Sequence, residues 1–181
     1  LVFASSWRAG SHWLLAEHRL AGASVLVGAA YLALAQETAL RIWNTERFEI
    51  KRLALLAPLL VEADERLRVV VSVTREKENL RLAVDSHSPS QGWRAHATAE
   101  LARLLPDQQE AIDLAGLRDQ CSEDVPLSAM RAGPVEASPR WNCLRSVRRS
   151  GDLWFGELVV PPSLHATFPS SGSTPRCWTW R

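Results

Sequence analysis

His18 is the residue whose type and spacing most clearly suggest chemistry. It stands four residues before Gly22, at the start of the apolar run H-R-L-A-G-A-S-V-L-V-G-A-A-Y-L-A-L-A, residues 18–35. An unperturbed imidazole has a pKa of about 6.5, so near neutral pH it is largely uncharged and can accept a proton. The run is shorter than the about 20 apolar residues that span a bilayer, and it ends in Gln36 and Glu37. We therefore expect a buried helix with His18 at its beginning.

The other histidines and the cysteines do not form a metal-ligand pattern. His12 and His18 are six residues apart, which at about 100° per residue places them on different faces of a helix, and neither HExxH nor HxxEH spacing is present. Cys121, Cys143 and Cys177 show no CxxC spacing. The sequence therefore predicts no metal site, and an odd number of cysteines fits a reducing cytoplasm better than a disulfide scaffold.

Composition and charge argue against several classes of partner. The chain has 181 residues, 46% of them hydrophobic and 23% charged, which is ordinary for one globular domain or for one and part of another. The net charge is +1, the basic run 145–149 is short and reads as a solvated face, and the eight tryptophans are not interleaved with a basic groove. We expect no nucleic acid partner. No secretion signal is apparent, and because the chain begins at Leu1 rather than Met we expect a fragment.

The elements that must position His18 follow from the periodicity of the apolar residues. Over residues 27–43 they recur near a period of 3.6, which predicts one helix with one buried face that ends at Asn44. The residues of that face are Tyr31, Leu32, Ala35, Ala39 and Ile42.

After this helix the period changes to two, which predicts antiparallel strands. Residues 67–76 and 79–86 alternate and are joined by a short polar turn, so we expect them to be neighbours in one sheet. Residues 48–61 should form the strand before them, with Pro58 at an edge or a bulge. Residues 93–105 should form a fourth strand. Its expected inward-facing residues are Trp93, Ala95, Ala97, Ala99 and Leu101.

One long helix followed by antiparallel strands predicts an α+β fold in which a sheet wraps round the helix, the hotdog fold. Strand-like sequence returns at residues 143–161, with a turn at Ser150-Gly151-Asp152. We therefore expect the first half of a double hotdog with a truncated second half. The expected parts are an N-terminal hotdog at 1–105, a linker at 106–134, the beginning of the C-terminal hotdog at 135–169, and an aberrant tail at 170–181.

The segment that carries His18 resembles the start of the dehydratase domain of modular polyketide synthases. In H-W-L-L-A-E-H-R-L-A-G-A-S-V-L-V-G, His18 and Gly22 have the spacing of the family motif HxxxGxxxxP, and Val27 stands in place of the proline. The stretch W-R-A-H-A-T-A-E-L is similar to the family's W-x-x-H-A-x-G strand, from which it departs at Ala99 and Glu100.

A second stretch, residues 135–164, is similar to the family's V-x-Y-G-P-x-F-Q segment and the two strands after it, which open the second hotdog. Pro139 is kept. The family's Tyr-Gly and Phe-Gln are replaced by Ala137-Ser138 and Trp141-Asn142. The similarity covers nearly the whole chain up to residue 164 in the family's order.

The resemblance implies dehydration of a β-hydroxyacyl thioester to the α,β-unsaturated thioester. It implies that His18 is the base for the α-proton, and that Gly22, Val27 and Gly28 bind substrate. The N–H groups at the Gly28 end of the helix would polarise the thioester carbonyl. In the family the acid is an aspartate in the motif H-P-A-L-L-D, which does not occur in this sequence.

The resemblance also implies that no cofactor is needed, because the substrate arrives on the phosphopantetheine of an acyl carrier protein. The implied partners are that carrier protein, other synthase domains and a second copy of the chain in a homodimer, with no membrane and no nucleic acid, in the cytoplasm. His12 and His96 match family positions that we interpret as packing residues.

Because the acid motif is absent, other functions stay open. The chain could be a non-catalytic hotdog remnant with only a binding or dimerisation role. It could also be a stand-alone hotdog thioesterase, although the start of a second hotdog argues against that. The resemblance implies a hydro-lyase, and we expect the truncated chain to be inactive.

The tail G-S-T-P-R-C-W-T-W-R, residues 172–181, has no periodicity and begins where the family places its second catalytic motif. Back-translated with permitted codons, preceded by one C and read one base earlier, it encodes R-L-H-P-A-L-L-D-V-A. We therefore expect a reading-frame error near Ser170 or Ser171, with the aspartate codon lying across Trp178 and Thr179. A tail from the wrong frame has no selected apolar pattern, so we expect it to be loosely packed.

Overall fold

The computed structural model describes residues 1–10, 13–45, 47–63, 65–104, 111–130, 135–160 and 162. Two compact units are centred on Leu1–Gln109 and Glu110–Cys177. His12 and the tail at 170–181 lie outside the described residues.

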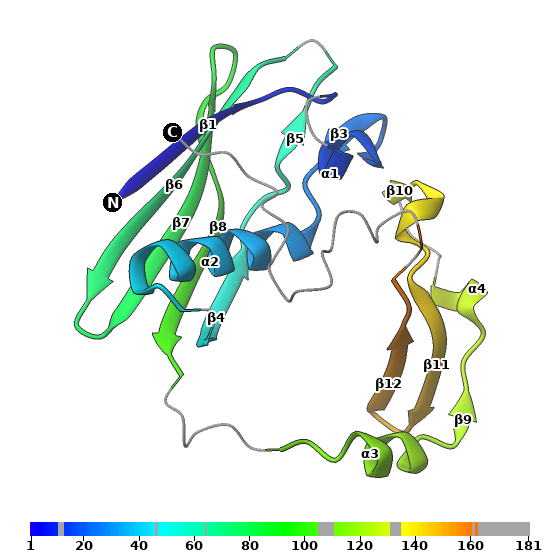
Figure 1. The fold of residues 1–181 in the computed structure, drawn as a ribbon. Helices are drawn as coiled ribbons and strands as arrows, with labels where there is room; N and C mark the ends of the chain where they lie inside the picture. Colours follow the sequence, from blue (N-terminus) through cyan, green and yellow to red (C-terminus); the bar gives the residue numbers. More distant parts are fainter. Residues whose placement is uncertain are drawn as a thin grey trace. The chain divides into compact units, whose positions relative to one another are not determined.

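The first unit contains a five-stranded antiparallel sheet in the order β1-β6-β7-β8-β4 (Figure 1). Strands β6 and β7 pair across a short turn, which confirms the two neighbouring strands predicted there. Strand β1, which the periodicity did not reveal, pairs with β6 at one edge of the sheet. The strands are β1 (Val2–Trp7), β4 (Phe48–Leu55), β6 (Leu67–Glu76), β7 (Asn79–Ser88) and β8 (Gly92–Arg103).

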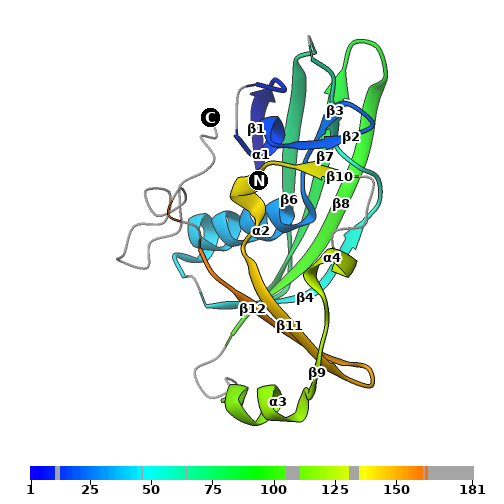
Figure 2. The same cartoon turned by 90° about the vertical axis from the view of Figure 1, so that its right-hand side faces the viewer.

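Helix α2 (Gly28–Trp43) lies against one face of this sheet (Figures 1 and 2). It confirms the predicted helix and ends where expected, at Asn44, whose left-handed conformation (φ 53°, ψ 40°) directs its N–H to the carbonyl of Leu40. The prediction that Leu32 lies on the buried face is wrong. Its side chain is 46% exposed, because the buried positions recur as the pairs 30 and 31, 34 and 35, and 38 and 39. The buried residues are Ala30, Tyr31, Leu34, Ala35, Thr38 and Ala39.

The apolar run at residues 18–35 is not one helix. After α1 (Trp13–Ala16) the chain forms a hairpin of β2 (His18–Leu20) and β3 (Ala23–Val25), and the helix begins only at Gly28. Ala21 and Gly22 have φ of 50° and 86°, a pair of positive values that is typical of a tight hairpin turn. The expectation of a helix from His18 onward is therefore wrong, because this turn interrupts the run.

The strand predicted at 48–61 is two strands in different sheets. Strand β4 is an edge strand paired with β8, whereas β5 (Leu60–Val61) pairs with β3. Pro58 lies in the break between them, where a residue without an N–H does not interrupt a ladder of hydrogen bonds.

Strand β8 contains a bulge that shifts its alternation. Its pairing with β7 passes from Val84–Ala97 to Asp85–Ala95, which leaves His96 as an extra residue. Ala97, Ala99 and Leu101 face the core as predicted. Trp93, which is 62% exposed, and Ala95 do not, because His96 takes the buried position instead.

The second unit is built on the hairpin of β11 (Leu144–Ser150) and β12 (Leu153–Leu158), which confirms the two strands and the turn predicted at 143–161. The basic run at 145–149 faces two carboxylates of β9 (Glu123–Asp124). Arg149 lies 2.7 Å from Glu123, and Arg148 lies 3.1 Å from Asp124. Exposed pairs of this kind contribute little to stability, because solvent screens the charges. The remaining elements are α3 (Leu114–Gln120), α4 (Leu127–Met130), β10 (Val135–Ala137) and the 3-10 helix η2 (Pro139–Trp141).

Val27→Pro is expected to stabilise the first unit by about 0.4–1 kcal/mol, because proline restricts the unfolded chain. Val27 already has φ −68°, close to the value that proline imposes, and its N–H makes no hydrogen bond to any described residue. Urea unfolding measures the effect, with Val27→Ala as the control that loses the side chain without fixing φ. A lower midpoint for the proline variant would contradict the path found for this segment.

Candidate active site

His18 is the first residue of β2 and is buried, with 6% of its surface exposed. It directly follows α1, whose Leu14 and Leu15 are also buried. Burial lowers the pKa of His18 below 6.5 by disfavouring the charged form, while the Leu14 backbone and the negative charge of Glu17 act in the opposite direction. The imidazole is therefore neutral at pH 7, the form that accepts a proton.

Gly22 lies in the turn of the hairpin that carries His18. Its φ of 86° is one that residues with a side chain rarely adopt. No atom lies within 4 Å of the position that a Cβ would take, so the turn conformation requires glycine and close packing does not. Its carbonyl accepts a hydrogen bond from Arg19 Nη1 at 3.0 Å, which ties the turn to β2.

Val27 and Gly28 form the beginning of α2. Val27 is the N-cap residue and provides no side-chain cap, while its carbonyl accepts the N–H of Ala30. A Cβ on Gly28 would lie 3.6 Å from Leu55 Cδ1, an ordinary contact, so space does not demand glycine. The first N–H groups of a helix point outward with partial positive charge, which suits a polarised carbonyl oxygen.

The hairpin brings His18 back toward this helix start. Strands β2 and β3 pair Arg19 with Ser24, and one further step in the same register places His18 opposite Val25, two residues before Val27. Gly22 lies at the other end of the hairpin. The pairing thus puts His18 next to the strand that leads into α2 and leaves Gly22 at the hairpin tip.

Tyr31, the one tyrosine of the chain, is a polar residue that helical spacing alone assigned to packing. It is 3% exposed, burial raises its pKa to about 12, and its hydroxyl has no hydrogen-bond partner among the described residues. Its position one turn after Gly28, as the one aromatic residue on the buried face of α2, is the sequence signal that could have drawn attention to it.

His96, interpreted from the sequence as a packing residue, is 2% exposed and hydrogen-bonded on both ring nitrogens. Its Nε2 lies 2.7 Å from Ser86 Oγ, and its Nδ1 lies 3.2 Å from the carbonyl oxygen of Ala57. Burial lowers its pKa below 6.5. Because both ring nitrogens are hydrogen-bonded within the protein, the surroundings of His96 are those of a packing residue and not of an exposed base.

Acidification is expected to destabilise the first unit. Burial lowers the pKa of both His18 and His96, so below pH 6.5 the unfolded chain binds more protons than the folded chain. Above pH 6.5 the two histidines make their full contribution to the free energy of unfolding. This contribution is lost as the pH falls through 6.5 toward the lower folded-state pKa values. Melting temperatures between pH 7.5 and 5 should show this decline. His18→Gln should flatten it; an unchanged decline in His18→Gln contradicts the assignment.

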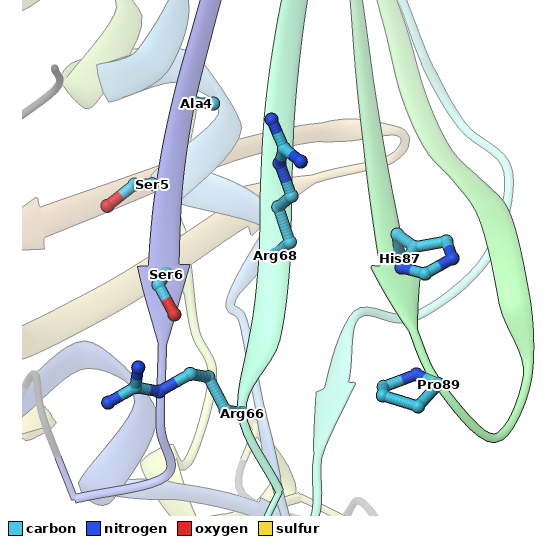
Figure 3. Close-up of a pocket in the computed structure, with 7 residues that line it drawn as sticks. All are labelled: Ala4, Ser5, Ser6, Arg66, Arg68, His87 and Pro89. Carbon is cyan, nitrogen blue, oxygen red and sulfur yellow. The ribbon is translucent and has the colours of Figure 1, made fainter.

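An open groove of about 810 Å³ lies on the side of the sheet opposite α2 (Figure 3). Neither His18 nor Gly28 lines it, and Figure 3 shows the guanidinium groups of Arg66 and Arg68 pointing in different directions. The groove is therefore separate from the predicted site, and its two guanidinium groups do not converge on one point. The described residues that line it are Ala4, Ser5, Ser6, Arg66, Arg68, His87 and Pro89.

Two features are absent from the part of the chain that the structure describes. No cluster of three or more His, Cys, Asp or Glu side chains is placed to hold a metal ion. No helix there combines the length and apolar character needed to cross a membrane.

Known proteins resemble the chain in sequence. A family model described as the polyketide synthase dehydratase domain matches residues 1–88. A phenolphthiocerol/phthiocerol polyketide synthase of Mycobacterium tuberculosis is 25% identical over 140 residues, 69% of this chain and 6% of that protein.

Solved structures resemble the fold. The dehydratase domain from the CurK module of curacin polyketide synthase has a TM-score of 0.76 at 16% identity, over 92% of this chain and 62% of that one. The dehydratase domain of PpsC from Mycobacterium tuberculosis has a TM-score of 0.65 at 23% identity, over 94% and 60%. The chain thus spans less than two thirds of these domains. The predicted α+β hotdog fold is confirmed, and the predicted resemblance to polyketide synthase dehydratase domains is confirmed by the family model, which matches residues 1–88.

Proposed function

We propose that this chain supplies the proton-accepting half of a dehydratase that removes water from a β-hydroxyacyl thioester. The observation that carries the proposal is the buried imidazole of His18, kept neutral by its surroundings, at the base of a hairpin that leads into the start of α2. Elimination of water from such a substrate needs a base for the α-proton and an acid for the hydroxyl.

His18 would take the proton from the α-carbon, and the electron pair of that C–H bond would form the double bond to the β-carbon. The β-carbon–oxygen bond would break, and the hydroxyl would leave as water with a proton from the acid. The N–H groups of Gly28 and Ala29, at a helix start without a side-chain cap, would stabilise the negative charge that develops on the thioester oxygen.

The proposed partners are inferred from the resemblance to the dehydratase family. The proposed acid is inferred from the same resemblance and from the codons of the tail. The acid would be the aspartate of H-P-A-L-L-D, which the codons for residues 172–181 can encode one base out of frame. The substrate would be carried on the phosphopantetheine of an acyl carrier protein, so that no cofactor is needed. Other synthase domains and a second copy of the chain would be the remaining partners, in the cytoplasm.

The test is a chain made from the same gene with one base inserted in the codon for Ser171, called the frame-restored chain. In it, His18→Ala should lower kcat/KM for dehydration about 10²–10⁴-fold, the usual contribution of a general base. His87→Ala, which replaces a histidine on the opposite side of the sheet from α2, should leave it unchanged. Equal activity with and without His18 would overturn the proposal.

The absence of the acid motif favours a second candidate, a hotdog remnant with a binding or dimerisation role only. It would be supported if the frame-restored chain were inactive while the chain itself formed a stable dimer. Size-exclusion chromatography of both chains, alongside the assay, separates the two functions.

A further inference from the structure

His96 stands at a junction between the central sheet and the segment that leads to the active-site hairpin. Its backbone carbonyl accepts the N–H of Leu56 at 2.8 Å and that of Ala57 at 3.4 Å. Its imidazole lies between Ser86 of β7 and the carbonyl of Ala57. The main chain and the side chain of one residue therefore both hold the corner that follows β4.

The hydrogen bonds determine the tautomer of His96. A carbonyl oxygen can only accept, so Nδ1 carries the proton that binds Ala57. Nε2 is then the acceptor for the hydroxyl of Ser86. The bulge in β8 is what turns this side chain inward, since it adds one residue opposite the Val84–Asp85 step of β7.

The corner held by His96 continues directly into the hairpin of His18. The carbonyl of Leu59, a fully buried residue, accepts the N–H of Leu26 at 3.0 Å. The next residues, Leu60 and Val61, pair with Val25 and Ser24 of β3. Strand β3 is the hairpin partner of β2, which begins at His18.

We propose that His96 is a positioning residue for His18: it ties residues 56–59 to the central sheet and so fixes the hairpin that holds the base. The role of His18 as base rests on the proposed function. The role of His96 in holding the hairpin rests on hydrogen bonds alone and can be tested without turnover.

The first measurement is the protonation state of His96 by NMR of the ¹⁵N- and ¹³C-labelled chain. We expect the Nδ1–H tautomer at pH 7. The Nε2–H tautomer would overturn the proposal, because the bond to Ala57 requires a proton on Nδ1.

The second measurement is hydrogen exchange in a His96→Leu variant, which loses both side-chain bonds. The amide of Leu26 and the amides of residues 18–25 and 56–61 should exchange at least about tenfold faster, while those of Val71 and Leu82 in the central sheet keep their rates. Because the hairpin would open to water, the pKa of His18 should also move up toward its ordinary value.

Two further variants separate positioning from general destabilisation. His96→Asn places an amide N–H near the position of Nδ1 and should restore slow exchange and the titration of His18. Thr38→Val removes another buried hydrogen bond of the first unit, from Oγ1 to the carbonyl of Leu34 at 2.8 Å, and should leave both readouts unchanged.

The outcomes are decisive in either direction. Faster exchange spread equally over β6, β7 and the hairpin would make His96 an ordinary stability residue and overturn the proposal. An unchanged titration of His18 in a folded His96→Leu chain would do the same.

If His96→Leu does not fold, Ser86→Ala, which removes only the bond to Nε2, must show the same local pattern in weaker form, and its absence overturns the proposal. If the frame-restored chain does not dehydrate the thioester but the His96 variants behave as expected, the proposed function is wrong and the role of His96 in holding the hairpin stands.

Discussion

The unaltered chain is expected to form no α,β-unsaturated product from a β-hydroxyacyl pantetheine thioester, although His18 is in place. Dehydration needs an acid opposite the base, and H-P-A-L-L-D is absent from residues 1–181. Loss of one member of a catalytic pair that acts as a unit removes most of the rate enhancement. Mass spectrometry of the thioester measures the result, with the frame-restored chain as the positive control. Product from the unaltered chain that disappears in His18→Ala would show that another residue serves as the acid.

The DNA sequence tests the cause of that expected inactivity. Read one base earlier, the codons for residues 172–181 should spell L-H-P-A-L-L-D, for example CTC CAC CCC GCG CTG CTG GAC. Most bases of these codons are dictated by the residues present, among them Trp178, which has a single codon. If the shifted codons do not spell the motif, the frame-error hypothesis is wrong and the tail needs another explanation.

Gly22→Val is expected to destabilise the first unit by about 1–2 kcal/mol, the cost of holding a residue with a side chain at a positive φ. Gly22 has φ 86°, and no atom lies within 4 Å of the position that a Cβ would take, so the cost comes from the backbone and not from a clash. Because the turn closes the hairpin of His18, the frame-restored variant should also lose dehydratase activity.

Gly10→Val is the matched control for that substitution. Gly10 also has no atom within 4 Å of its Cβ position, but its φ is not in the positive region. It should therefore cost much less in urea unfolding. Gly22→Asn should fall between the two, because asparagine tolerates positive φ better than valine. Equal losses for Gly10→Val and Gly22→Val would mean that the turn conformation is not what requires glycine.

The parts of the fold that could be predicted are those in which one periodicity runs without interruption. Apolar residues occupy every second position from Leu67 to Val73, and β6 has the predicted bounds, Leu67–Glu76. The helix that ends at Asn44 was equally clear, because apolar residues recur along it near a period of 3.6 and asparagine favours the left-handed cap.

The parts that could not be predicted are those in which a local backbone feature breaks the pattern. The two strands of the hairpin at 18–25 have three residues each, too few to show a period of two, and only Gly22 marks the turn. At His96 a bulge reverses which residues face inward, and nothing in a single sequence distinguishes an inserted residue from a continuing alternation.

The candidate site residues His18 and Gly22 stay a prediction, and the hydrogen bonds that hold their hairpin could not be predicted from the sequence. The spacing of His18 and Gly22 is local, and family resemblance recognised it. The role of His96 depends on residues 39 positions away in the chain, at Ala57, so no motif around His96 could reveal it. Tyr31 was overlooked for a different reason. Its position on the buried face of α2 is explained by packing alone, so nothing in the sequence pointed to another role.

The connectivity of the five-stranded sheet has a consequence for how the first unit folds. Strands β6, β7 and β8 follow one another through short turns, so their pairings close small loops, whereas Val2 of β1 must find Ser72 across most of the unit. Closure of a flexible loop costs about 0.6 kcal/mol more for each doubling of its length. The three-stranded meander should therefore form early and serve as the template, with β1 and the hairpin of His18 docking last. The residues proposed for the chemistry are added to a framework that can assemble before them.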